Sequence, residues 1–187
     1  MKRLLILLLI NILCFQTGFS QENDNAKILK VILSKYYATE KVIVKDRLQF
    51  LNFYCIKAPN NEEVFEAISK NDFLKKHEAE IKNQIKDNSE QDWHKEYNLL
   101  FEKEHQYLKS KVRDCISLEE FQKIATKNNV NYHRLLIVGK PIYLEKKFCL
   151  IKVAFYRTIE HNSSRFFLFE NINSEWKIKE TINEWET

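Results

Sequence analysis

FCLIKVAFYR, residues 148–157, is largely apolar in both of its alternating sets of side chains, and this pattern determines the architecture of the chain. Successive side chains of a β-strand point to opposite faces of the sheet. One face would carry Cys149, Ile151, Val153 and Phe155, and the other would carry Phe148, Leu150, Ala154 and Tyr156. A strand that is covered on both faces belongs in the middle of a sheet. We therefore predict a central strand over residues 148–157.

Segments on either side of this strand share a strand-like composition of β-branched and aromatic residues, with short polar turns between them. They are Leu135–Val138, Pro141–Leu144, Phe166–Glu170 and Glu175–Thr181. In the last segment Trp176 and Ile178 alternate with Lys177 and Lys179, as expected where one face meets water. Residues 133–187 are thus predicted to form an antiparallel β-meander of three to five strands.

The preceding part of the chain, residues 21–128, is predicted to be mainly helical. Apolar residues recur at helical spacing, and capping residues mark several starts. The expected helices are Asn25–Tyr37, Asn60–Lys70, Asp72–Lys86, Asp92–Val112 and a short one that ends near Lys127. Ser117 and Glu120 form a capping box at the start of the short helix. The apolar residues of positions 41–56 follow neither a helical nor a strand periodicity consistently. The fold class is α+β, with one domain over residues 21–187 in which the helical half packs on the meander.

The closing strands also carry a resemblance. KPIYLEKKFCLIKVAFYR, residues 140–157, followed by FFLFENINSEWKIKE, residues 166–180, resembles the C-terminal meander of small, uncharacterised exported bacterial proteins. It is also loosely similar to the closing strands of nuclear-transport-factor-2-like, or cystatin-like, α+β folds, which often finish on a Trp-Lys-Ile strand. The long helical middle departs from the cystatin-like pattern. Such folds host many functions, so the resemblance implies no catalytic residue.

The first twenty residues have the pattern of a secretory signal peptide. A basic start, Lys2-Arg3, precedes the apolar run LLILLLINILC of residues 4–14, which is too short to cross a bilayer that needs roughly 20 apolar residues. Gly18 and Ser20 place small residues where signal peptidase requires them, so we expect cleavage after Ser20 and a secreted or periplasmic protein. A lipoprotein acylated at Cys14 is the alternative, which the bulky Leu13 disfavours.

Removal of this segment leaves Cys55, Cys115 and Cys149 in an oxidising compartment. Three thiols allow at most one internal disulfide, and the sequence leaves open whether two of them pair. Cys55 and Cys149 lie in apolar stretches and are interpreted as small core residues rather than as catalytic ones. Because the sequence has no C-x-x-C spacing, we expect no zinc site, and we predict neither another bound metal nor a cofactor.

Charge and glycine content exclude several classes of function. After cleavage, 28 basic side chains face 26 acidic ones, a net charge of +2 that is too small and too evenly spread for nucleic-acid binding. The single glycine left, Gly139, cannot form a phosphate-binding glycine-rich loop. We also expect no transmembrane anchor in the mature chain.

Two polar residues fall in the apolar stripes of the long helices. His77 lies within the stripe of the helix predicted over residues 72–86, and Glu104 lies within that of the helix predicted over residues 92–112. A short linker would make these helices antiparallel neighbours and bring the two side chains level. We predict a buried His77–Glu104 pair, which is either a structural polar contact or an acid/base couple, and these two residues are the catalytic candidates.

Other histidines give weaker patterns. Glu102 and His105 have a spacing used by di-iron bundles, but no second copy exists, and His94 and His105 lack a third ligand. Exposed aromatic side chains could form a protein-binding patch, with Tyr54, Tyr143, Phe166 and Trp185 as candidates.

The sequence therefore favours an exported, non-enzymatic binding or interaction domain that contacts an unknown protein or small molecule. Alternatives are a small pocket-bearing hydrolase or ligand-binding protein of cystatin-like type, with His77 and Glu104 in its lining, and an immunity-type toxin antagonist.

Overall fold

The computed structural model describes residues 24–36, 43–44, 47–48, 50–60, 62–87, 89–103, 112–127, 133–156 and 162–186. The first helix covers residues 24–36. After it come, in chain order, β1 (Ile43–Val44), β2 (Arg47–Leu48), β3 (Phe50–Tyr54), α2 (Glu63–Ser69), α3 (Asp72–Lys76), α4 (Glu78–Ile85), α5 (His94–Lys103), β4 (Val112–Ile116), α7 (Leu118–Lys127), β5 (His133–Val138), β6 (Ile142–Leu144), β7 (Phe148–Tyr156), β8 (Ser163–Ile172) and β9 (Glu175–Glu186). The predicted signal peptide lies outside the described residues.

A mixed sheet organises the described part of the chain. Its strand order is β4-β3-β5-β7-β8-β9, and β6 pairs with β7 beside this path. β3 runs parallel to both β4 and β5, whereas β7 pairs antiparallel with β5, β6 and β8, and β9 pairs antiparallel with β8. β7 therefore lies inside the sheet, as its sequence predicts. The α+β class and the antiparallel meander are confirmed.

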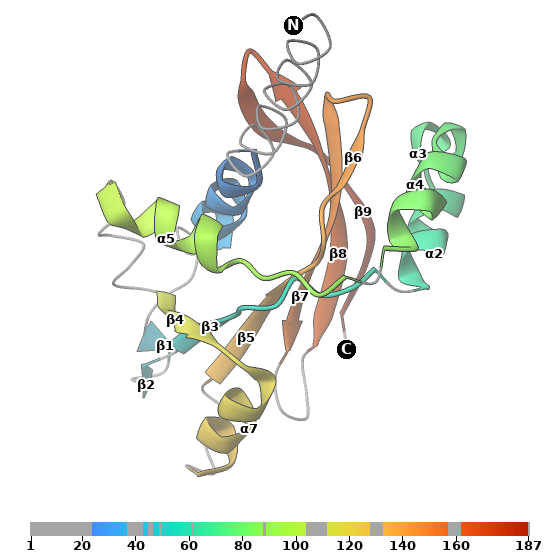
Figure 1. The fold of residues 1–187 in the computed structure, drawn as a ribbon. Helices are drawn as coiled ribbons and strands as arrows, with labels where there is room; N and C mark the ends of the chain where they lie inside the picture. Colours follow the sequence, from blue (N-terminus) through green and yellow to red (C-terminus); the bar gives the residue numbers. More distant parts are fainter. Residues whose placement is uncertain are drawn as a thin grey trace, which may run out of the picture.

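Both faces of β7 are buried, and each belongs to a different apolar core. Cys149, Ile151 and Val153 pack in the first core with residues of the first helix and of α5. Phe148 and Leu150 pack in the second core with residues of α2, α3 and α4. Figure 1 shows the corresponding arrangement, with the first helix and α5 on one side of the sheet and α2–α4 on the other. The sheet is thus the middle layer of three.

The first helix is positioned by the apolar stripe that the sequence predicts for it. Ile28, Leu29 and Ile32 are fully buried, and Tyr36 is nearly so. The ring of Tyr36 meets that of Phe155 edge-on, with centroids 4.5 Å apart. Burial raises the pKa of Tyr36 to about 12, so its hydroxyl stays protonated near neutral pH.

The predicted helical hairpin is wrong. α4 and α5 lie against opposite faces of the sheet, because Ile81 of α4 belongs to the second core and Tyr97 of α5 belongs to the first. The linker between them is extended and pairs with the segment that follows β3, where Lys57 N–H donates to the Gln91 carbonyl. Two apolar faces on β7 require cover on both sides, and one hairpin can cover only one of them.

Two predicted helices also end differently from expectation. The helix predicted over residues 72–86 is split at His77, which leaves the helical region at φ −102° and ψ 11°. The helix predicted over residues 92–112 is confirmed as α5 over His94–Lys103, residues 104–111 lie outside the described residues, and Val112 begins a strand instead of ending a helix. β4 forms because its backbone pairs in parallel with β3, a contact between distant segments that no local pattern signals.

The predicted capping box is confirmed at the start of α7. The Ser117 hydroxyl accepts from the Glu120 N–H at 3.2 Å, and the Glu120 carboxylate accepts from the Ser117 N–H at 2.8 Å. These hydrogen bonds, with the one from the Ser117 hydroxyl, lower the pKa of Glu120 from its usual 4.5. α7 then returns the chain from β4 to β5, and its Phe121 is fully buried.

Ser117→Ala removes the hydroxyl from this cap, and we expect it to lower the free energy of unfolding by about 1 kcal/mol at pH 7. A carboxyl whose pKa is lower in the folded state stabilises the fold above its unfolded pKa, and that contribution is lost as the pH falls through the folded value. The effect of Ser117→Ala should therefore shrink below about pH 4. Urea unfolding at both pH values measures it, with the exposed Ser69→Ala as control. An equal loss at both pH values would contradict the role of the Glu120 charge.

Candidate functional site

The chain crosses from one face of the sheet to the other at a junction between residues 55–58 and 91–93. Trp93 N–H donates to the Cys55 carbonyl at 2.8 Å, and Lys57 N–H donates to the Gln91 carbonyl at 2.8 Å. Ile56 and Asp92 form an isolated antiparallel bridge between these two hydrogen bonds. The segment that directly follows β3 thus pairs with the segment that leads into α5.

A disulfide between Cys55 and Cys115 closes the junction on one side. Their Cα atoms are 5.0 Å apart, within the range of protein disulfides, and the bond joins residues 60 positions apart in the sequence. Parallel pairing of β3 with β4 brings the two together, since Cys115 lies opposite Phe53 in the register. In the chain-entropy model, a crosslink over a loop of this length stabilises the fold by about 4 kcal/mol.

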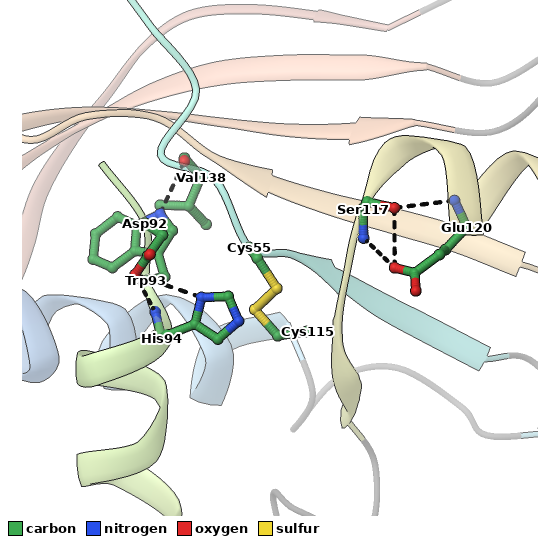
Figure 2. The surroundings of a disulfide bond; sticks show 8 residues. All are labelled: Cys55, Asp92, Trp93, His94, Cys115, Ser117, Glu120 and Val138. Atoms are coloured by element: carbon green, nitrogen blue, oxygen red, sulfur yellow. Dashed lines mark hydrogen bonds and ion pairs between the residues drawn. A yellow bond between two sulfur atoms is a disulfide. The ribbon is translucent and has the colours of Figure 1, made fainter. Parts of the chain in front are cut away.

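His94 lies directly beside the disulfide. Figure 2 shows its imidazole between Asp92 and the two sulfur atoms. Asp92 Oδ1 accepts a hydrogen bond from the His94 backbone N–H at 3.0 Å and lies 3.5 Å from His94 Nδ1. The His94 side chain is 57% exposed, while Cys55 is buried and Cys115 is half-buried. A ligand atom of each of Cys55, His94 and Cys115 lies within 4.8 Å of the other two.

A buried ion pair lies on the inner side of the junction. Lys57 Nζ is 2.7 Å from Glu96 Oε1, and the two side chains are only 7% and 4% exposed. Glu96 lies in the first turn of α5, where the helix dipole favours a negative charge. Lys57 Nζ also lies 4.6 Å from the ring centroid of Trp93, whose Nε1–H donates to the Val138 carbonyl at 3.1 Å.

This ion pair continues into a short polar network. Asn25 Nδ2 donates to Glu96 Oε1 at 3.1 Å, and the Tyr143 hydroxyl donates to Asn25 Oδ1 at 2.6 Å. Burial raises the pKa of Tyr143 far above its usual range, so the group remains a neutral donor. The network joins four separate segments: the first helix, the segment after β3, α5 and β6. Its geometry therefore indicates a structural role.

Of the two predicted catalytic candidates, only His77 is among the described residues. Its Nε2 lies 3.1 Å from Glu145 Oε1, and its Nδ1 lies 3.3 Å from Glu80 Oε2. The side chain is 16% exposed, and its ring packs against Phe73 at the border of the second core. Glu104 lies outside the described residues, so its pairing with His77 stays a prediction, but the helical hairpin on which that prediction rested is absent.

The remaining predictions about single residues have mixed outcomes. Cys149 is fully buried, as predicted, and it takes no part in the disulfide; burial raises the pKa of its thiol far above its usual range, which makes it a poor nucleophile. Among the candidate patch aromatics, Trp185 is exposed, but Phe166 is completely buried in the second core and was wrongly placed. Phe166 sits in the middle of β8, which is covered on both faces.

The junction itself was missed by the sequence analysis. Cys55 was correctly interpreted as buried, but no pattern in the sequence linked it or His94 to Cys115. The three residues are separated by long stretches of chain: the parallel register of β3 with β4 brings Cys55 to Cys115, and the hydrogen bond from Trp93 N–H to the Cys55 carbonyl brings His94 beside them. Export combined with three cysteines was the one available signal, because it made a single disulfide permissible.

Comparisons with protein-family models, with curated proteins and with solved structures find no match to this chain. The similarity of the closing strands to exported bacterial proteins and to cystatin-like folds therefore stays a prediction. In the part of the chain that the structure describes, no helix combines the length and the apolar character that crossing a bilayer requires.

We expect Lys57→Met to lower the free energy of unfolding by about 3–5 kcal/mol, because it leaves the Glu96 carboxylate buried without its cation. The double variant Lys57→Met/Glu96→Gln should recover much of that loss, since the amide is neutral and still accepts from Asn25. Denaturant unfolding of the single and double variants measures this coupling. The exposed pair Lys82–Glu78 supplies a control, where Lys82→Met should cost less than about 1 kcal/mol. Additive losses in the double variant would contradict a coupled buried pair.

Proposed function

We propose that this protein is an exported domain of the periplasm or extracellular space, processed after Ser20, that acts by binding a protein or small-molecule partner. The Cys55–Cys115 disulfide carries the proposal. Structural disulfides persist in oxidising compartments and are rare in the reducing cytosol. The disulfide links the edge strand β4 to the segment after β3. It therefore points to the same oxidising compartment as the leader-like pattern of residues 1–20.

Support for binding rather than catalysis comes from the way the charged side chains are used. Glu96 holds Lys57 and Asn25 at the junction. On the other face, Glu63 of α2 accepts from Lys152 of β7 at 2.8 Å and from Ser164 of β8 at 3.2 Å. The Glu96 and Glu63 carboxylates thus hold helices and a connecting segment in place, and we interpret both as structural rather than catalytic groups.

Trp185 near the end of β9 offers a contact of the kind that anchors interfaces. The side chain is 38% exposed, and its Nε1–H donates to Glu63 Oε2 at 3.3 Å. A hydrogen bond to the sheet-facing side of α2 limits the motion of the indole, so little conformational entropy is lost when a partner covers it. Tryptophan is enriched among the residues that dominate binding energy at interfaces. We place the partner-binding surface around Trp185.

Export is tested by fractionating the native host and determining the N-terminal residue of the protein by mass spectrometry. We expect a chain that begins at Gln21 in the periplasm or medium, with Cys55 and Cys115 linked before any reductant is added. A lipid on Cys14 would move the protein to a membrane surface. Recovery of the unprocessed, fully reduced chain from the cytosol would contradict the proposal.

Binding is tested by co-purification from the same fractions with Trp185→Ala. We expect the variant to lose its partner by tenfold or more, because truncating an interface tryptophan costs about 2 kcal/mol or more. Ile172→Ala is a matched control, since Ile172 is 43% exposed at the opposite end of the same β8–β9 hairpin. Equal recovery of the partner with both variants would place the binding surface elsewhere.

A further inference from the structure

We propose that the junction is also a redox-controlled metal site, in which the dithiol form of Cys55 and Cys115 binds a thiophilic divalent cation such as Zn²⁺ together with His94. The sequence alone predicts no metal, because the three residues are far apart along the chain. Folding gathers them at one point, where a thiolate, a second thiolate and an imidazole make a donor set typical of zinc.

The positions of the three side chains fit such a site. Their ligand atoms all lie within 4.8 Å of one another. A tetrahedral zinc ion with Zn–S of about 2.3 Å and Zn–N of about 2.1 Å holds its ligand atoms roughly 3.5 Å apart. The sulfur atoms must therefore separate after reduction, and we expect Cys115, the less buried of the two, to turn. Protein supplies three ligands, which leaves the fourth position to water.

Asp92 adds the outer contact that metal-binding histidines usually have. Its Oδ1 lies 3.5 Å from His94 Nδ1, and Figure 2 shows it on the side of the imidazole away from the sulfur atoms. Such a carboxylate fixes the orientation of the ring and increases the basicity of the ligating nitrogen. The bond from the His94 backbone N–H to the same carboxylate holds Asp92 in place. The exposed imidazole gives a cation access from solvent.

The chemistry balances with a dithiol reductant of the thioredoxin type. Two electrons and two protons from that dithiol cleave the Cys55–Cys115 bond, giving two thiols, and the reductant becomes a disulfide. Binding of the cation then displaces both thiol protons to water. Since the cation binds only the dithiol, it stabilises that form by mass action and opposes closure of the disulfide. The end of β3 and the strand β4 would thus be linked either by the disulfide or by the bound cation.

The test uses the mature chain, residues 21–187, in oxidised form and after reduction with a phosphine, with Co²⁺ and Zn²⁺ as probes. We expect the reduced chain to bind one Co²⁺, detected by thiolate-to-cobalt charge-transfer absorption, and Zn²⁺ to displace it. The oxidised chain should bind neither ion. Circular dichroism shows whether the reduced chain is folded, and added Zn²⁺ should restore any structure lost on reduction.

Variants that leave the disulfide intact identify the ligands. His94→Ala changes an exposed side chain and should weaken Zn²⁺ binding at least tenfold, and Asp92→Asn, which keeps the oxygen that caps α5, should weaken it by about tenfold. Cys149→Ala is the matched control and should bind Zn²⁺ as the natural chain does, because Cys149 is fully buried in β7 and is not part of the Cys55–His94–Cys115 cluster. The cobalt spectrum of the His94→Ala variant should also change.

Four results would overturn the proposal: no Co²⁺ or Zn²⁺ binding by the folded reduced chain, equal binding by the oxidised chain, unchanged affinity in His94→Ala, or an unfolded reduced chain that Zn²⁺ does not restore. In the first and last cases the disulfide is a structural crosslink only, and in the other two the cation binds without the proposed set of ligands. The proposal is independent of the partner surface around Trp185, so its failure would leave export and binding standing.

Discussion

Burial of β7 on both faces is the constraint from which the rest of this structure follows. Cys149, Ile151 and Val153 face one core, while Phe148 and Leu150 face the other. Apolar surface on both sides of a sheet is stabilised only when both sides are removed from water, at roughly 25 cal/mol for each Å² buried. The chain therefore needs a helical layer on each face, and a single helical hairpin cannot supply both.

Two layers require the chain to pass from one face to the other. It does so between α4 and α5, where an extended linker would expose its peptide groups unless they were paired. The segment after β3 pairs with it through Lys57 and Trp93, and the Trp93 side chain bonds to Val138 in the neighbouring strand. The Lys57–Glu96 pair and the disulfide then fix this crossing from inside and outside. The buried ion pair and the disulfide thus both lie where the chain crosses from one face of the sheet to the other.

Local patterns predicted the parts of the fold that local physics determines. The period of two over residues 148–157, the stripe of the first helix and the Ser117–Glu120 capping box each depend on neighbours in sequence, and each is confirmed. The strand β4 and the placement of α5 depend on contacts between distant segments, so the same patterns wrongly extended a helix to Val112. Periodicity alone cannot distinguish a helix that packs on the near face from one that packs on the far face.

The candidate site was unpredictable for the same reason. His77 and Glu104 were chosen because each lies in an apolar stripe, but the helical hairpin that was to bring them level does not exist. The residues that the fold does gather, Cys55, His94 and Cys115, carry no spacing motif and meet through the β3–β4 pair and through the pairing of residues 91–93 with the segment after β3. This cluster therefore depends on strand pairing between distant segments and not on a local sequence motif.

Amide hydrogen exchange of the oxidised protein tests this dependence of the crossing on the central sheet. If the junction is an integral part of the sheet, the amides of Lys57 and Trp93, which donate across it, should exchange as slowly as that of Ile151 in the middle of β7. Exchange of Lys57 and Trp93 at the rate of exposed turn residues, while Ile151 remains protected, would show that the crossing opens on its own and would contradict the account.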